Sequence, residues 1–312
     1  MSEIRNEGHV LQFGVFPNCN GSCDFCLREE RIPYNKEKQL WMIENIKKNI
    51  TVIDWKDKFK FGISLLGGEL FYTTDIDIQN SILSLIDCII EKILKVSDVA
   101  RFSTVTNGNY NPDFLYRCID KIIKNVGIQA IDVNFSYDIK YRFKNEESRL
   151  RVLKNINDFH KKYNYNVGVQ MILTQYLIDM WKNDQFEVNK FIEENIPGNM
   201  ICFLYPHKIN TGIVLKDFQF KRNDLLEFVK YLKSANYDIY MSFLQSVKNS
   251  ATFKYTGLKE RGVLGPYEEP KLTDGKEIIN DHCGHSTLYQ CYADCDNCML
   301  CDLQLLDEEA YL

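Results

Sequence analysis

Three cysteines near the start of the chain have a spacing that could bind a metal cluster. Cys19, Cys23 and Cys26 form a C-x3-C-x2-C run directly after the apolar stretch Val10 to Phe16. Thiolates favour iron–sulfur clusters or zinc over hard cations. Three of them on one loop can hold three irons of a [4Fe–4S] cubane and leave the fourth iron open. A structural zinc loop is the alternative, although zinc normally takes four ligands and no partner pair of cysteines lies nearby.

The next three apolar segments each end in small or polar residues. These endings are Gly67-Gly68-Glu69 after 61–66, Asn107-Gly108 after 101–106, and Ser136-Tyr137-Asp138 after 130–135. With the cysteine run, these motifs resemble the radical S-adenosylmethionine (radical SAM) superfamily, and the resemblance covers roughly residues 9–205. It implies a [4Fe–4S] cluster on Cys19, Cys23 and Cys26, with S-adenosylmethionine as the cofactor. It also implies reductive cleavage to methionine and a 5′-deoxyadenosyl radical, with a flavodoxin- or ferredoxin-type electron donor.

The resemblance assigns a cofactor contact to several of these residues. Gly67 and Gly68 let the backbone approach a ligand closely, and the Glu69 carboxylate can pair with the methionine ammonium group. Asn107 resembles the asparagine of the family's Thr-Asn-Gly, and Ser136 with Asp138 resembles the Ser-x-Asp that contacts the cofactor ribose. Each could instead be a turn or cap former. The chain departs from many peptide-modifying members, which have Asp-Gly at this strand end, because Ile139 follows Asp138.

Other polar residues and cysteines are ambiguous from sequence alone. Gln170 lies in the strand expected at 166–173, and sequence cannot say to which face of the sheet its side chain points. Three arginines, Arg142, Arg149 and Arg151, are interpreted as solvated helix charges, with a contact to the methionine carboxylate as the alternative. Three isolated cysteines, Cys88, Cys118 and Cys202, are interpreted as core residues, because a free buried cysteine behaves as a small hydrophobe. The catalytic acid or base stays unknown.

Strand and helix patterns alternate along most of the chain. Strands are expected at 10–16, 59–66, 101–106, 128–136, 166–173 and 200–205, and helices near 36–50, 76–96, 112–125, 146–163, 184–195 and 223–235. Six β/α units with short connections predict an α/β fold with a parallel sheet. The resemblance sharpens this to a partial (β/α)6 TIM-type barrel, with chemistry at the carboxyl ends of the strands.

The pattern changes near residue 238, where a loop-rich stretch begins that ends in five cysteines. These are Cys283, Cys291, Cys295, Cys298 and Cys301. The set resembles a Twitch or truncated SPASM extension, which implies one auxiliary [4Fe–4S] cluster. A small zinc knot that includes His282 or His285 is the alternative. We therefore expect a barrel at 1–238 and a small Cys-rich extension at 239–312.

Composition limits the classes of function. The formal net charge of −5 argues against a generally basic nucleic-acid surface. The N-terminus lacks the apolar core of a signal peptide, and no apolar run has the length of a membrane span. With 11 cysteines and no export signal, cluster or metal ligation is expected rather than disulfides. We therefore expect a cytoplasmic protein.

The leading hypothesis is a radical SAM enzyme that abstracts hydrogen from a C–H bond of a peptide or protein side chain. The expected first strand begins near residue 10, so no leader-peptide-binding domain is expected before it. A sugar, nucleoside or other small metabolite is the alternative substrate. A non-catalytic iron–sulfur or zinc protein is the hypothesis from a different class. The motif Gly67-Gly68-Glu69 argues against that class, because an electron carrier needs no site for the cofactor amino group.

Overall fold

The computed structural model describes residues 9–16, 19–21, 23, 35–52, 61–96, 100–143, 145–204 and 221–235. Strands and helices alternate over these residues. In chain order they are β1 (His9–Phe16), α1 (Lys36–Val52), β2 (Phe61–Gly67), α2 (Ile76–Ile89), β3 (Arg101–Thr106), α3 (Asp113–Val126), β4 (Ile131–Tyr137), α4 (Glu146–Tyr163), β5 (Gly168–Ile172), α5 (Gln175–Lys182), α6 (Val188–Asn195), β6 (Ile201–Leu204) and α7 (Arg222–Ser234).

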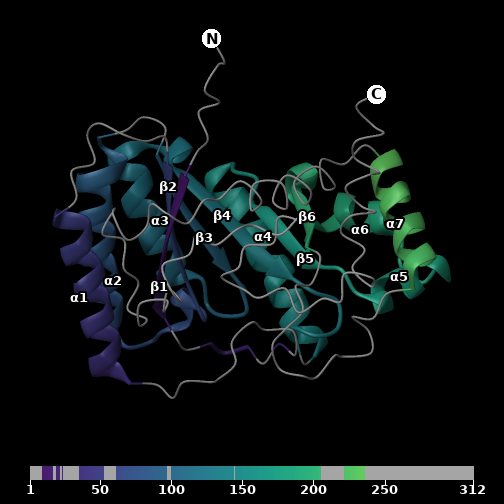
Figure 1. The fold of residues 1–312 in the computed structure, drawn as a ribbon, viewed down its shortest axis with the longest axis horizontal. Helices are drawn as coiled ribbons and strands as arrows, with labels where there is room; N and C mark the ends of the chain where they lie inside the picture. Colours follow the sequence, from purple (N-terminus) through teal and green to yellow (C-terminus); the bar gives the residue numbers. More distant parts are fainter. Residues whose placement is uncertain are drawn as a thin grey trace, which may run out of the picture.

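The strands form one six-stranded sheet in the order β1-β2-β3-β4-β5-β6, and every neighbouring pair is parallel. In Figure 1, α1 and α2 stand at the β1 end of the sheet, and α5, α6 and α7 stand at the β6 end. Sequential parallel strands joined by helices are the architecture of a partial (β/α)6 TIM-type barrel. The predicted α/β fold with a partial barrel is therefore confirmed, whereas the predicted Cys-rich extension at 239–312 lies outside the described residues.

Alternating side chains on the strands explain how the core forms. On β4, Val133 and Phe135 are fully buried, whereas the intervening Asp132 is exposed and Asn134 is half-buried. Phe135 packs edge-to-face on Phe159 of α4, with ring centroids 6.2 Å apart. The apolar face of the sheet therefore meets the helices, and the opposite face carries polar side chains.

Polar side chains at the start of several helices fix the loops that follow the strands. Asp75 accepts hydrogen bonds from the N–H groups of Asp77 and Ile78 at the start of α2, and Asn145 accepts one from Ser148 in α4. Thr174 accepts one from Leu177 in α5. Such caps satisfy N–H groups that have no partner within the helix. Each of these helices therefore begins at a defined distance from the carboxyl end of its strand.

Two helices differ from the prediction. The helix expected at 76–96 is α-helical only to Ile89 and continues as a π-helical turn, Ile90–Leu94, which keeps Ile90, Ile93 and Leu94 buried. The connection between β5 and β6 holds two helices, α5 and α6, where one was expected at 184–195. The capping residue Thr174, with Leu177 and Ile178 on one face, is the sequence signal that could have predicted α5.

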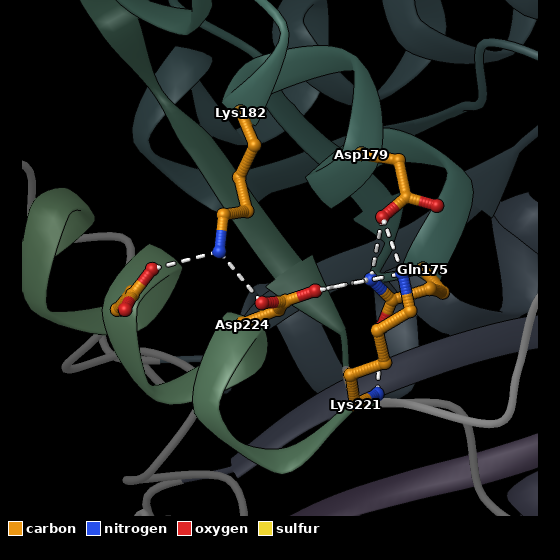
Figure 2. Close-up of polar contacts among 6 residues, drawn as sticks. Gln175, Asp179, Lys182, Lys221 and Asp224 are labelled. Carbon is orange, nitrogen blue, oxygen red and sulfur yellow. Dashed lines mark hydrogen bonds and ion pairs between the residues drawn. The ribbon is translucent and has the colours of Figure 1, made fainter.

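A polar cluster joins α5 to α7, and Figure 2 shows its central residue, Asp224, between Lys182 and Gln175. One oxygen of Asp224 accepts a hydrogen bond from Lys182 at 2.6 Å, and the other accepts one from the Gln175 amide at 3.2 Å. The Gln175 oxygen accepts from the backbone N–H of Lys221 at 2.8 Å. Trp181 of α5 and Phe228 of α7 also pack edge-to-face, with centroids 5.1 Å apart. The cluster and the ring pair together fix α7 against α5.

Replacing Asp224 by alanine is expected to lower the free energy of unfolding. The buried Gln175 amide loses one of its partners, which costs about 1 kcal/mol, and Lys182 loses its better-buried carboxylate. The matched control is Glu227→Ala, which removes the other, more exposed carboxylate of Lys182. The measurement is the urea midpoint by circular dichroism. Equal midpoints for the two variants would contradict the role of Asp224.

Candidate functional site

The candidate residues gather at the edge of the sheet where the strands end. Phe16 at the end of β1 pairs with Gly67 at the end of β2, and Thr106 at the end of β3 pairs with Phe135 of β4. The cysteine run, Glu69, Asn107 and Asp138 each follow one of these strand ends within a few residues. Parallel strands bring their carboxyl ends to one edge, as the sequence analysis expected.

Glu69 is buried, and its carboxylate ties the loop after β2 to the loop after β3. Only 1% of the residue is exposed. One oxygen accepts hydrogen bonds from the Thr106 hydroxyl at 2.8 Å and the Phe71 N–H at 3.3 Å, and the other accepts one from the Asn107 N–H at 2.6 Å. Burial raises the pKa of Glu69 to about 7, against the opposite effect of these donors and of Arg142. The carboxyl group therefore titrates near neutral pH.

A second buried hydroxyl extends this contact. The Thr106 hydroxyl also lies within 2.5 Å of the Tyr110 hydroxyl, and it accepts a hydrogen bond from the Gly108 N–H at 3.1 Å. Burial and the nearby Glu69 raise the pKa of Tyr110 well above its usual value. Glu69, Thr106 and Tyr110 therefore form a short buried chain of groups that can exchange hydrogen-bond direction.

Asn107 directs its side chain at the cysteine loop. Its Nδ2 donates to Asn20 Oδ1 at 2.8 Å and to Cys19 Sγ at 3.6 Å. The Asn20 amide in turn donates to the Asn109 carbonyl at 2.7 Å. The loop after β1 and the loop after β3 are therefore joined by side-chain hydrogen bonds.

Two of the run's sulfurs approach the same glycine. A Cβ on Gly21 would lie 3.4 Å from Cys19 Sγ and 3.5 Å from Cys23 Sγ, and the Gly21 N–H donates to Cys19 Sγ at 3.3 Å. Two soft donors that converge on one backbone position, with N–H groups directed at one of them, are chemically suited to a thiolate-bound cluster. Cys26 lies outside the described residues. Among the described residues, no group of three His, Cys, Asp or Glu side chains could hold a metal ion.

Asp138 caps the turn after β4. One of its oxygens accepts hydrogen bonds from the N–H groups of Lys140, Tyr141 and Arg142. Burial raises the pKa of Asp138 to about 6, while the N–H groups of Lys140 and Arg142 and the charge of Arg142 act in the opposite direction. The geometry matches the cap that the sequence analysis gave as the alternative role for this residue.

Arg142 differs from its expected setting. It lies in the loop before α4 rather than on a helix, it is half-buried, and its charge lowers the pKa of both Glu69 and Asp138. The guanidinium group of Arg149 donates to the Ile139 carbonyl at 2.5 Å, and that of Arg151 pairs with Glu147 at 2.7 Å. The interpretation of Arg142 as a solvated helix charge was therefore wrong.

The face of the sheet opposite the helices carries a row of polar positions. Ser136 on β4 pairs in register with Gln170 on β5, which pairs with Cys202 on β6. Asn134 lies two residues before Ser136 on β4 and therefore on the same face of the sheet. This register places Gln170 on the face of the sheet opposite the helices, which could not be decided from sequence.

Of the three isolated cysteines, Cys118 is fully buried as predicted, and Cys88 is half-buried against the core. Cys202 lies in the polar row rather than in the core.

Four residues that hold the candidate site together were not predicted as site residues. Asn20 and Asn155 bind the loop after β3, and Thr106 bonds both Glu69 and Tyr110. Two signals were available: Thr106 stands in the Thr-Asn-Gly run with Asn107, and Asn155 is a polar residue on the expected buried face of a helix. Like Cys26, the five C-terminal candidate ligands lie outside the described residues: Cys283, Cys291, Cys295, Cys298 and Cys301. None of the helices in the described ranges is long and apolar enough to cross a membrane.

Comparisons with known proteins give matches only among solved structures. No protein-family model and no curated protein matches the chain. A histidine-tagged anSMEcpe with bound AdoMet matches at a TM-score of 0.49 and 17% identity, over 76% of this chain and 59% of that chain. Streptococcus suis SuiB bound to precursor peptide SuiA matches at a TM-score of 0.49 and 16% identity, over 74% of this chain and 46% of that chain. A spore photoproduct lyase with bound AdoMet and dinucleoside spore photoproduct matches at a TM-score of 0.35 and 13% identity, over 61% of this chain and 55% of that chain. The chain thus spans about half the length of these structures.

Proposed function

We propose that this protein is a radical SAM enzyme. The observation that carries the proposal is the approach of Cys19 and Cys23 to Gly21 at the carboxyl edge of a parallel partial barrel, beside Asn107 and Glu69. Soft donors at this edge, rather than at the amino edge or on a helix surface, are in the position where barrels of this kind carry out chemistry. Cys26 is the third proposed cluster ligand.

Cys19, Cys23 and Cys26 would hold the [4Fe–4S] cluster. The cluster, when bound together with S-adenosylmethionine, supplies the electron that generates a 5′-deoxyadenosyl radical for hydrogen abstraction. The chain itself supplies position and exclusion of water. Hydrogen bonds from the Gly21 N–H and the Asn107 amide would stabilise negative charge on the Cys19 sulfur. We further propose a flavodoxin- or ferredoxin-type electron donor.

Gly67, Gly68 and Glu69 are the proposed site for the methionine amino group. A carboxylate can accept about four hydrogen bonds, and the Glu69 carboxylate accepts three from the protein. It therefore retains capacity for an ammonium donor. Ser136 and Asp138 are the proposed ribose contacts. Ser136 lies near the carboxyl end of β4, whereas one Asp138 oxygen already caps the following turn and only the other would face a ligand.

A peptide or protein side chain is the proposed substrate, because the five C-terminal cysteines resemble the auxiliary-cluster extension of peptide-modifying enzymes. In this proposal residues 1–238 are the barrel and 239–312 hold a second [4Fe–4S] cluster. A sugar, nucleoside or other small metabolite is the second candidate. The polar row of Asn134, Ser136 and Gln170 favours it, since neutral amides and a hydroxyl suit a neutral polar ligand.

The proposed function is tested by cofactor cleavage. Anaerobically reconstituted protein, treated with dithionite and S-adenosylmethionine, should form 5′-deoxyadenosine and methionine, measured by liquid chromatography and mass spectrometry. A non-catalytic iron–sulfur carrier would hold a cluster without forming 5′-deoxyadenosine. A zinc protein would contain zinc and no acid-labile sulfide. Either result from a folded, fully reconstituted sample would overturn the proposal.

A further inference from the structure

We propose that Asn107 acts on the cysteine loop rather than on the cofactor, and that its hydrogen bond to Cys19 raises the reduction potential of the bound cluster. The inference deepens the proposed function and rests on it. It also changes the role that sequence motifs suggested for Asn107.

The side chain of Asn107 has little capacity left for another ligand. Its Nδ2 has two N–H groups, and these meet Asn20 Oδ1 at 2.8 Å and Cys19 Sγ at 3.6 Å. Its Oδ1 accepts from the Asn109 N–H at 2.8 Å, and its backbone N–H donates to Glu69 at 2.6 Å. The residue is 6% exposed. Both amide donors therefore serve the loop that carries Cys19.

The loop that presents Asn107 is bound to helix α4 by two hydrogen bonds. Asn155 of α4 is buried, and its amide donates to the carbonyl groups of Gly108 at 2.8 Å and Tyr110 at 2.9 Å. Gly108 has a φ of +64°, and a Cβ there would lie 2.7 Å from the Phe135 ring. Glycine is required at this position by conformation and by space. Asn155 is therefore a positioning residue, because it acts on Cys19 only through Asn107.

The consequence for Cys19 follows from charge. Its sulfur receives N–H groups from Asn107 and from Gly21, and hydrogen bonds to cluster sulfurs are one of the factors that set the potential of an iron–sulfur centre. Reduction adds negative charge to the cluster, so an N–H donor stabilises the reduced form more than the oxidised form. Loss of the Asn107 donor should therefore make the cluster harder to reduce.

The test compares Asn107→Ala with the matched control Asn109→Ala. The control removes an asparagine side chain from the same loop but keeps the backbone N–H and carbonyl that contact Asn107 and Asn20. The measurement is a potentiometric titration followed by electron paramagnetic resonance, using the signal that changes when S-adenosylmethionine is added. Asn107→Ala should lower the equilibrium constant for reduction about tenfold, equal to about 59 mV for a one-electron couple. Asn109→Ala should leave the potential unchanged.

Each outcome bears on the inference. Asn155→Ala should shift the potential in the same direction by a smaller amount. Loss of iron from Asn107→Ala with full iron in Asn109→Ala also supports the inference, because the same amide holds the loop. An unchanged potential and full iron content in Asn107→Ala would overturn it and leave the proposed function intact. A wild-type protein that assembles no cluster at 19–26 would instead overturn the proposed function.

Discussion

Replacing Cys19 or Cys23 by alanine is expected to abolish formation of 5′-deoxyadenosine. An open iron requires that the other three irons of the cubane be held, and each thiolate of the run holds one. Removal of one ligand leaves a cluster that is not retained in the geometry needed for cofactor binding. The measurement is 5′-deoxyadenosine per cluster under dithionite, together with iron and sulfide content.

The matched control is Cys88→Ala, the same chemical change at a half-buried cysteine near Thr51 of α1, away from the strand ends. It should keep wild-type cleavage. Undiminished cleavage by Cys23→Ala would contradict the assignment of the run. The triple variant at Cys19, Cys23 and Cys26 adds a test of the C-terminal cysteines. It should retain about four irons per chain if they hold a second cluster, whereas stoichiometric zinc without sulfide would indicate a structural knot.

The fold could be predicted because its signals are local and repeated. On β3 the buried positions Phe102, Thr104 and Thr106 alternate with half-buried ones, which is a period that sequence shows directly. Helix α4 carries acidic residues in its first turn, basic residues in its last turn and buried residues on one face. The short α5 was missed because eight residues give only two turns of pattern, and its cap is a common residue type.

The positions of the candidate site residues could be predicted from the sequence, but the contacts between them could not. The position of Glu69 and Asn107 after their strands follows from the order of β/α units. Their hydrogen bonds do not, because Glu69 meets residues 37 and 38 positions away and Asn107 meets Cys19 at a separation of 88. An amide at a strand end fits a ligand contact and a loop brace equally well. Only the direction of its N–H groups separates the two.

Glu69→Gln is expected to be more stable than the wild type at pH 8 but similar to it at pH 4.5. The folded-state pKa of about 7 lies above the unfolded value of 4.5. Between these values the folded protein holds a proton that the unfolded chain has lost, so the wild-type free energy of unfolding falls as pH rises. The fall is about 1.4 kcal/mol per pH unit, on the order of 3 kcal/mol in all, and it is complete above about pH 7. Glutamine has no such ionisation.

Glutamine should also preserve the two shorter contacts of Glu69. Its oxygen can accept from the Asn107 N–H, and its amide can donate to Thr106, whose hydroxyl can turn toward Tyr110. The 3.3 Å contact with the Phe71 N–H is lost, because that N–H bonds the oxygen that the glutamine amide nitrogen replaces. The control is Glu69→Ala, which removes the charge but leaves the Asn107 N–H without an acceptor, so it should be less stable than Glu69→Gln at every pH. Urea unfolding at several values from pH 4.5 to 8 measures the differences. A constant difference between Glu69→Gln and wild type would show that burial does not shift the ionisation.

The same variant separates a brace from a cofactor contact. If Glu69 binds the methionine ammonium group as proposed, Glu69→Gln loses a charge-assisted hydrogen bond worth roughly 1.5–3 kcal/mol, and the affinity for S-adenosylmethionine should fall about tenfold or more. Wild-type affinity should rise with pH up to about 7, because only the carboxylate attracts the cation, and the variant should lack that component. Calorimetry on the reconstituted proteins measures both. Equal affinities, with the expected change in stability, would make Glu69 a brace between the loops that follow β2 and β3 and would leave the ammonium group to the backbone of Gly67 and Gly68.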